Sequence, residues 1–206
     1  MSTIAEIRNS LGGPSTEYRA KQLHAVPESP VVQREPFILE RCAGKVVLDI
    51  GASGPMHESI VRVASKCYGI EKPGGPGMSD VVRGDTIEFI DLDDYHQILP
   101  IFSGVEIIIC GEVLEHLSNP GWFLTRLRKA YNCPLIITVP NAFGEAGRRS
   151  LERGIENCNI DHIAWHSHRT IKTLLNRHGY GIIEFYWYGR NGQRPKFSEG
   201  LIVVTE

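Results

Sequence analysis

The segment from Val46 to Gly54 constrains the fold of this chain more than any other. It begins with a short apolar run, broken only by Asp49, and continues into the small residues Gly51–Gly54. Valine, leucine and isoleucine in succession are typical of a strand buried on both faces, and glycine lets a backbone bend sharply against a ligand. After the turn, apolar residues recur with helical spacing at Ile60, Val61 and Ala64. The segment therefore predicts a strand, a nucleotide-binding loop and a helix N-terminus, the first unit of a doubly wound sheet.

Length and composition favour one domain. The chain has 206 residues, of which 42% are apolar, enough for one sizeable core. Its formal net charge of −2 gives no overall electrostatic case for a nucleic-acid partner, although a local basic patch stays open. Five cysteines without a C-x-x-C pair suggest neither a disulfide framework nor a zinc site, so we expect a cytoplasmic location. No apolar stretch approaches membrane-spanning length, and we expect no membrane partner.

The chain divides into two regions of unequal character. Residues 1–34 are polar and broken by glycine and proline, which predicts a partly helical N-terminal arm or lid. Residues 35–206 carry the core. A helix from Val31 to Cys42 is expected to lead into the central strand, with Phe37, Ile38 and Leu39 on its buried side.

Seven apolar segments have the length and composition of strands. They are residues 46–50, 67–71, 81–85, 104–110, 134–139, 182–188 and 201–205. Helical patterns between the earlier segments favour parallel pairing, whereas the last two are expected to pair antiparallel. The prediction is an α/β fold with a doubly wound, seven-stranded, mostly parallel sheet and a final antiparallel strand.

Two carboxylates lie at the expected strand ends. Glu71 ends the second strand, 20 positions after Gly51, where a carboxylate can accept both hydroxyls of a ribose. Asp85, at the tip of the third strand, could meet the exocyclic amine of an adenine. The alternatives are a solvated glutamate before a Pro/Gly loop and an ordinary turn aspartate.

A group of ionisable residues follows the fourth strand. If Glu112–Leu117 forms a helical turn, then Glu112, Glu115 and His116 share one face at the carboxyl edge of the sheet. A histidine cluster follows the fifth strand, and it includes His162. Carboxylates are also favoured in the first turn of a helix by its dipole, so a purely structural role stays open.

The order of the elements and four segments together carry a family resemblance. The segments are Val46–Gly54, Gly69–Glu71, Glu112–Leu117 and the strand tip Val139–Asn141. With these features the chain resembles a class I S-adenosylmethionine-dependent methyltransferase with a Rossmann-like fold. The resemblance implies S-adenosyl-L-methionine as the cofactor. It places the following residues at the cofactor: Asp49, Gly51, Ser53, Gly54, Glu71, Asp85, Cys110 and Gly111. The loop departs from the family's alternating glycines, because Ser53 replaces the second glycine and Gly54 is displaced by one position.

Nicotinamide-dependent dehydrogenases use a similar strand, turn and ribose carboxylate, and they are the main alternative within this fold class. Two features favour the methyltransferase. The first turn lacks G-x-G-x-x-G, and the chain ends in a strand, helix and strand where dehydrogenases usually add a substrate domain.

The pattern Glu-x-x-Glu-His after the fourth strand, with an Asp-His pair after the fifth, also resembles metal-dependent O-methyltransferases. That resemblance implies Mg²⁺ or Mn²⁺ held by Glu112, Glu115, His116 and His162. A bound cation would lower the pKa of a substrate hydroxyl. We expect Glu112 and His116 to be catalytic; without a metal, His116 would serve as a general base or orient the substrate.

The expected reaction is O-methylation of a small hydroxylated molecule, such as a sugar or a natural-product intermediate, because the net charge is close to zero. The first alternative is 2′-O-methylation of an RNA end. In the enzymes that methylate small RNAs, an Asp-His pair is followed by aromatic and acidic residues and a tryptophan. Asp161–Trp165 resembles that pattern in its Asp-His pair and its tryptophan, but it lacks the aromatic and acidic residues between them. The second alternative is a non-catalytic S-adenosylmethionine-binding partner protein, which the irregular turn Ser53–Pro55 would suit.

Overall fold

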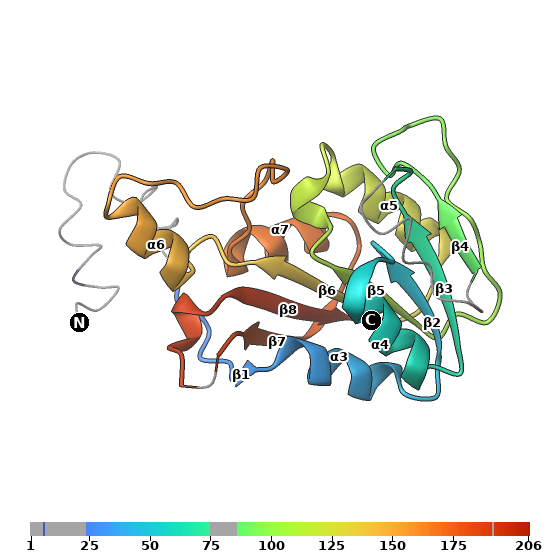
Figure 1. The fold of residues 1–206 in the computed structure, drawn as a ribbon, viewed down its shortest axis with the longest axis horizontal. Helices are drawn as coiled ribbons and strands as arrows, with labels where there is room; N and C mark the ends of the chain where they lie inside the picture. Colours follow the sequence, from blue (N-terminus) through green and yellow to red (C-terminus); the bar gives the residue numbers. More distant parts are fainter. Residues whose placement is uncertain (1–5, 7–23, 75–85, 191) are drawn as a thin grey trace.

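The computed structural model describes residues 6, 24–74, 86–190 and 192–206. Within them, eight strands form one sheet in the order β1-β7-β8-β6-β5-β2-β3-β4 (Figure 1). Only β8 runs antiparallel to its neighbours. The strands are β1 (Val31–Val32), β2 (Val46–Ile50), β3 (Lys66–Glu71), β4 (Thr86–Phe89), β5 (Ile107–Gly111), β6 (Leu135–Pro140), β7 (Ile182–Tyr188) and β8 (Gly200–Thr205).

The doubly wound, mostly parallel sheet with an antiparallel last strand is confirmed, and the count of seven strands is corrected to eight. The added strand is β1, which lies inside the helix expected from Val31. That helix, α3, begins only at Arg34 and ends at Cys42. The edge of β7 supplies the backbone partners of β1. Trp187 donates its backbone N–H to the carbonyl of Pro30, and Gly189 donates its backbone N–H to the carbonyl of Val32. These bonds and the two β-branched valines favour extended backbone.

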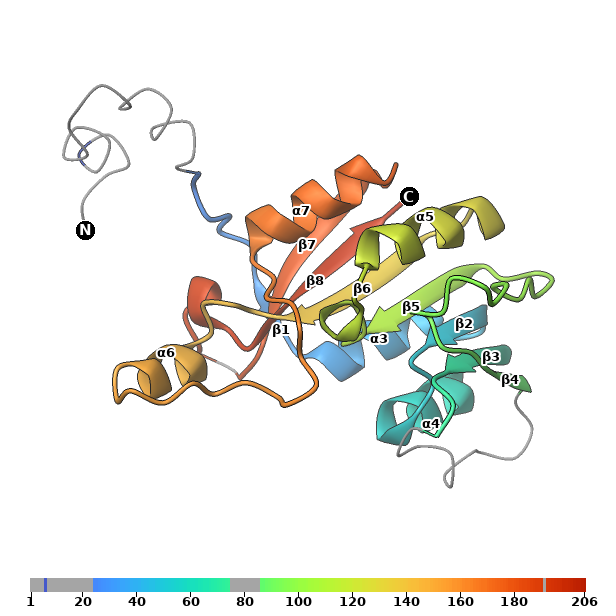
Figure 2. The same cartoon turned by 90° about the horizontal axis from the view of Figure 1, so that it is seen from above.

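Helices cover both faces of the sheet (Figure 2). On one face lie α3 and α4 (Gly54–Val63), and on the other lie α5 (Pro120–Ala130) and α7 (His168–Arg177). Strand β2 belongs to both cores, because Val47 packs in the cluster with α3 and α4 whereas Leu48 and Ile50 pack in the cluster with α5 and α7. This two-sided burial explains its nearly continuous apolar sequence.

The carboxyl ends of the parallel strands meet at one edge. Helix α6 (Glu145–Leu151) extends beyond the end of β6 on this side (Figure 1). The single-turn 3-10 helices η2 (Leu114–His116) and η3 (Pro195–Phe197) complete the described elements. No helix among the described residues is long and apolar enough to cross a membrane.

Two sequence predictions lie wholly or partly outside the described residues. The third expected strand, residues 81–85, and most of the N-terminal arm are not described. The strand that follows them, β4, pairs in parallel with β3, with Tyr68 opposite Thr86. Strand β4 thus occupies the place in the sheet that the third expected strand was to fill.

Candidate active site

The loop after β2 is held against β3 by its backbone. Gly51 and Ala52 both donate their N–H groups to the carbonyl of Ile70. Gly51 has φ 80°, and a Cβ there would lie 2.8 Å from Val113 Cγ2, so only glycine fits. The loop enters α4 through Ser53, whose hydroxyl makes no capping bond, and Gly54, with φ 67°. The N-terminus of α4 therefore has no side-chain cap from Ser53.

Asp49 and His57 form a buried pair beneath this loop. His57 Nδ1 lies 2.8 Å from Asp49 Oδ2, and both side chains are almost fully buried. Burial raises the pKa of Asp49, and the hydrogen bond to His57 opposes that shift. A Cβ on Gly69 would lie 2.6 Å from Ala52 Cβ, so the loop and β3 approach each other as closely as glycine allows.

Glu71 ends β3 with one carboxylate oxygen committed and the other available. Its Oε1 accepts from the N–H of Lys72 at 2.8 Å, whereas Oε2 is buried and has no hydrogen-bond partner among the described residues. A buried acceptor without a partner is costly unless a ligand satisfies it. Asp85, the other predicted cofactor carboxylate, lies outside the described residues.

Strand β5 brings Cys110 and Gly111 to the same edge. Cys110 lies opposite Ile50 in the pairing of β5 with β2. Its side chain is fully buried, and burial raises the pKa of the thiol well above its usual value. Cys110 is therefore a core residue with an inert thiol, and only its backbone can contact a ligand.

Glu112 leaves β5 with a left-handed backbone, φ 56°, which is the only positive φ found at a non-glycine residue in the described part of the chain. Its Oε1 accepts hydrogen bonds from Thr138 Oγ1 at 2.9 Å and Tyr188 OH at 2.8 Å. The guanidinium of Arg34 lies 3.5 Å from the same oxygen. The shared helical face expected for Glu112, Glu115 and His116 is therefore wrong, because the helical turn begins at Leu114 and Glu112 precedes it.

Glu115, His116 and His162 come together instead. One potential ligand atom from each lies within 4.8 Å of the others. Glu115 is 1% exposed, and neither carboxylate oxygen has a hydrogen-bond partner among the described residues. Burial, reinforced by the charge of Glu112, raises the pKa of Glu115 to about 8. Desolvation and the neighbouring His116 lower the pKa of His162, which favours the neutral imidazole that a metal requires.

Backbone contacts hold this cluster in place. Ile163 and Ala164 donate their N–H groups to the carbonyl of Glu115 at 2.9 and 3.1 Å. His116 Nδ1 lies 3.2 Å from the carbonyl of Asp161, so this nitrogen donates and Nε2 is the nitrogen left for a ligand. The rings of His116 and His162 meet edge to face, with centroids 4.7 Å apart. The segment after β6 is thus fastened to the turn after β5, 45 residues earlier in the chain.

No protein-family model matches the chain, and the search of curated proteins found no match. Solved structures do match. The small RNA methyltransferase HEN1 superposes with a TM-score of 0.66 at 18% identity, over 89% of this chain and 27% of that one. An S-adenosylmethionine-dependent methyltransferase from Aquifex aeolicus has a TM-score of 0.59 at 14% identity, over 100% of this chain and 98% of that one. Magnesium protoporphyrin IX methyltransferase from Synechocystis, solved with bound S-adenosylhomocysteine, has a TM-score of 0.58 at 15% identity, over 98% and 99%.

The protein has the class I S-adenosylmethionine-dependent methyltransferase fold.

In this methyltransferase fold, the predicted site residues that the structure describes gather at one edge of the sheet. Three of the four predicted metal ligands form one group, whereas Glu112 is not part of it. No local sequence pattern indicated Arg34, Thr138 and Tyr188, which hold the Glu112 carboxylate, because they come from three distant segments. His57 was not predicted either, although buried His57 and Ile60 stand three residues apart on α4, a spacing that marks the inner face.

Proposed function

We propose that the protein is an S-adenosylmethionine-dependent O-methyltransferase that acts on a small hydroxylated molecule with help from a divalent cation. In this reaction a substrate hydroxyl oxygen takes the methyl group from the sulfonium, S-adenosylhomocysteine leaves, and the hydroxyl proton is released. The observation that carries the proposal is the buried Glu115 carboxylate, which lacks a hydrogen-bond partner among the described residues and faces two imidazoles.

The described residues fit S-adenosylmethionine. The unsatisfied Oε2 of Glu71 would accept from the ribose hydroxyls, and the glycine-lined backbone at Gly51 would adjoin the methionine part. We retain Asp49, Ser53, Gly54, Cys110 and Gly111 as cofactor residues in this proposal. Asp49 would act through its hydrogen bond to His57, which fixes the strand before the loop to the helix after it.

The donor set also fits a divalent cation. One carboxylate and two imidazoles suit Mn²⁺ and borderline metals better than Mg²⁺, which prefers oxygen ligands. Bound there, the cation would lower the pKa of a substrate hydroxyl and orient a neighbouring oxygen. Glu115, His116 and His162 would hold it. Glu112 would be a catalytic residue beside the cation, with its carboxylate held by hydrogen bonds from Thr138 and Tyr188.

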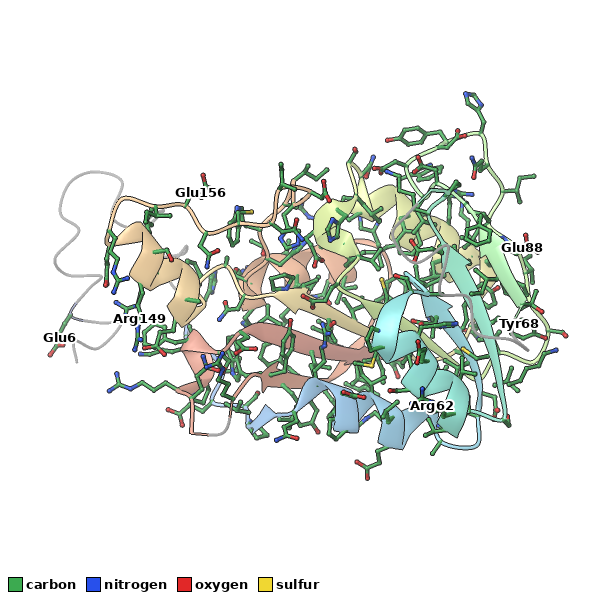
Figure 3. All side chains as sticks on the ribbon, in the orientation of Figure 1. Glu6, Arg62, Tyr68, Glu88, Arg149 and Glu156 are labelled. Carbon is green, nitrogen blue, oxygen red and sulfur yellow. The ribbon has the colours of Figure 1, made fainter. Side chains whose placement is uncertain are left out.

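Calorimetric titration of chelator-treated protein would test this function. We expect S-adenosylhomocysteine to bind without metal and Mn²⁺ to bind with its own isotherm. Glu115→Gln should abolish the metal isotherm and leave S-adenosylhomocysteine affinity within about twofold, because glutamine keeps the size and loses the charge. Glu156→Gln is the matched control, since Glu156 is exposed and points into solvent (Figure 3).

Two outcomes of that titration would change the proposal. Cofactor binding without any metal isotherm would leave His116 as a general base and remove the cation from the mechanism. Absence of cofactor binding would overturn the enzyme proposal. In the second case, a separate titration that shows NAD binding would support the dehydrogenase alternative.

A second candidate, methylation of an RNA end, is favoured by one specific observation. HEN1 is a small RNA methyltransferase, and its TM-score of 0.66 exceeds those of the two other structures described above. The Asp161–His162 pair also reaches the cluster through the Asp161 carbonyl and the His162 ring. Methylation of a synthetic RNA duplex in preference to free nucleosides and sugars would favour this candidate.

A further inference from the structure

A cavity of about 740 Å³ opens beside Glu112. Its lining residues come from the N-terminal end of α3, the end of β7, the residue before β8 and the end of β6. Its lining consists of two arginines, three glutamates, a glutamine, a glycine, a tyrosine and two prolines. Glu112 borders it, and Glu115 of the proposed metal site follows Glu112 by three residues in the chain.

One part of the cavity lining is a hydrogen-bonded polar group around Glu112. Tyr188 OH and Thr138 Oγ1 donate to the Glu112 carboxylate, and Arg34 lies 3.5 Å from it. The guanidinium of Arg34 also lies over the Tyr188 ring, 5.4 Å from its centroid. Burial and the neighbouring Glu112 carboxylate raise the pKa of Tyr188 well above its usual value, so the phenol keeps its proton. These contacts hold acceptors and donors side by side.

Most of the charges that line the cavity are paired with a charge of opposite sign. Arg34 faces Glu112, and Arg190 faces Glu199 with 3.3 Å between Nε and Oε1. The remaining carboxylate, Glu35, accepts a hydrogen bond from Ser59. An anionic ligand would meet three carboxylates, and a cationic ligand would meet the two guanidiniums of Arg34 and Arg190. Two prolines provide little surface for a flat apolar ligand.

A hydroxyl group suits such a lining because it donates and accepts at once. It can donate to a remaining lone pair of Glu112 and accept from an uncommitted N–H of Arg34, which has five. We infer that this cavity binds the body of a neutral, polyhydroxylated substrate of the pyranoside type, with Arg34, Glu112 and Tyr188 as its specificity-determining residues. The inference rests on the proposed function, since one hydroxyl of the same substrate would receive the methyl group.

Ligand-observed NMR with the protein saturated by S-adenosylhomocysteine would test the inference. The probes are methyl α-glucopyranoside, which is neutral, methyl α-glucopyranosiduronate, which is anionic, and glucosamine, which is cationic. We expect the neutral glycoside to bind about tenfold more tightly than either charged probe. Tighter binding of a charged probe, or no binding of the neutral one, would overturn the inference.

Two variants locate the binding. Tyr188→Phe removes only the hydroxyl, and we expect it to weaken glycoside binding about tenfold while S-adenosylhomocysteine affinity stays within about twofold. Arg34→Gln should do the same, and the melting temperature of each variant shows whether it folds. Tyr95→Phe is the matched control, because Tyr95 is exposed and does not line the cavity. Unchanged glycoside affinity in folded Tyr188→Phe and Arg34→Gln would overturn the assignment.

A catechol assay separates the failure of this inference from that of the proposed function. Catechol has two adjacent hydroxyls but no polyhydroxylated body. Catechol-dependent conversion of S-adenosylmethionine to S-adenosylhomocysteine, without glycoside binding, would retain the O-methyltransferase and refute the pyranoside cavity. Glycoside binding by a protein that binds no S-adenosylhomocysteine would refute the methyltransferase and support the cavity.

Discussion

His57 Nδ1 lies 2.8 Å from Asp49 Oδ2, and this buried contact ties helix α4 to strand β2 across the loop that is proposed to hold the cofactor. Asp49 precedes the loop and His57 follows it. The pair therefore fixes the distance between the two ends of residues 51–54 and keeps the N-terminus of α4 in one place. A buried ionisable pair costs desolvation energy, and its common benefit is a unique geometry.

Replacement of His57 by Ala should weaken both stability and cofactor affinity. Asp49 would lose its partner in a buried position, which we expect to lower the free energy of unfolding by about 3 kcal/mol. Chemical denaturation and S-adenosylhomocysteine titration measure the two effects. His57→Asn, which can still donate to Asp49, should recover part of the affinity. The exposed His96→Ala serves as control. Unaltered affinity in a folded His57→Ala protein would contradict the positioning role.

Replacement of Gly51 by Ala should abolish S-adenosylhomocysteine binding. The new Cβ would combine an unfavourable φ with a clash against Val113 Cγ2. Gly154 offers a matched control, because its φ of 75° is similar and no atom lies within 4 Å of the position a Cβ would take. Gly154→Ala should cost about 1 kcal/mol of stability and leave the affinity unchanged. Equal affinities of the two variants for S-adenosylhomocysteine would show that the loop accommodates a side chain in place of Gly51.

Replacement of Glu71 by Ala should reduce S-adenosylhomocysteine affinity by about tenfold to a hundredfold, because the ribose would lose a charged acceptor. The stability should change little or rise, since a buried acceptor without a partner disappears. Calorimetry measures the affinity. Glu88→Ala on the adjacent β4 is the control, and Glu88 is exposed (Figure 3). If both variants bind equally well, Glu71 does not contact the cofactor.

The stability of the metal-free protein should fall as pH rises through the range in which Glu115 releases its proton. The pKa of Glu115 is about 8 in the folded protein against 4.5 for the unperturbed group, so the folded state binds the proton more tightly. Between these values the unfolded state alone loses the proton, and the free energy of unfolding decreases. Glu115→Gln should remove this loss, which the two pKa values put at roughly 3 to 4 kcal/mol between pH 5 and pH 8. Urea denaturation in the presence of a chelator measures the free energy of unfolding at each pH. If this free energy changes with pH in the same way in the variant and the parent, the raised pKa of Glu115 is refuted.

Local sequence patterns were sufficient for most of the fold. The apolar run of β2 and its small-residue loop predicted the central strand and the turn into α4, because burial on both faces leaves a nearly continuous apolar segment. Helix α7 begins and ends at residue types that are typical of helix boundaries, with a capping box at Ser167 and with Gly179, at φ 81°, just after its end. Strand β1 was missed because Val31 and Val32 become a strand only when the edge of β7 supplies their backbone partners.

The sequence by itself determined the class of fold, the edge of the sheet where ligand-binding residues gather, and the residue types available there. Only the tertiary structure decided which of those residues contact one another. Glu115 joins His116 and His162 from a segment 46 positions later, whereas Glu112 turns to Thr138, Tyr188 and Arg34. The physical reason is that strand and helix patterns depend on neighbours within a few residues. The orientation of a carboxylate depends on backbone φ and on partners that approach only after the sheet has formed.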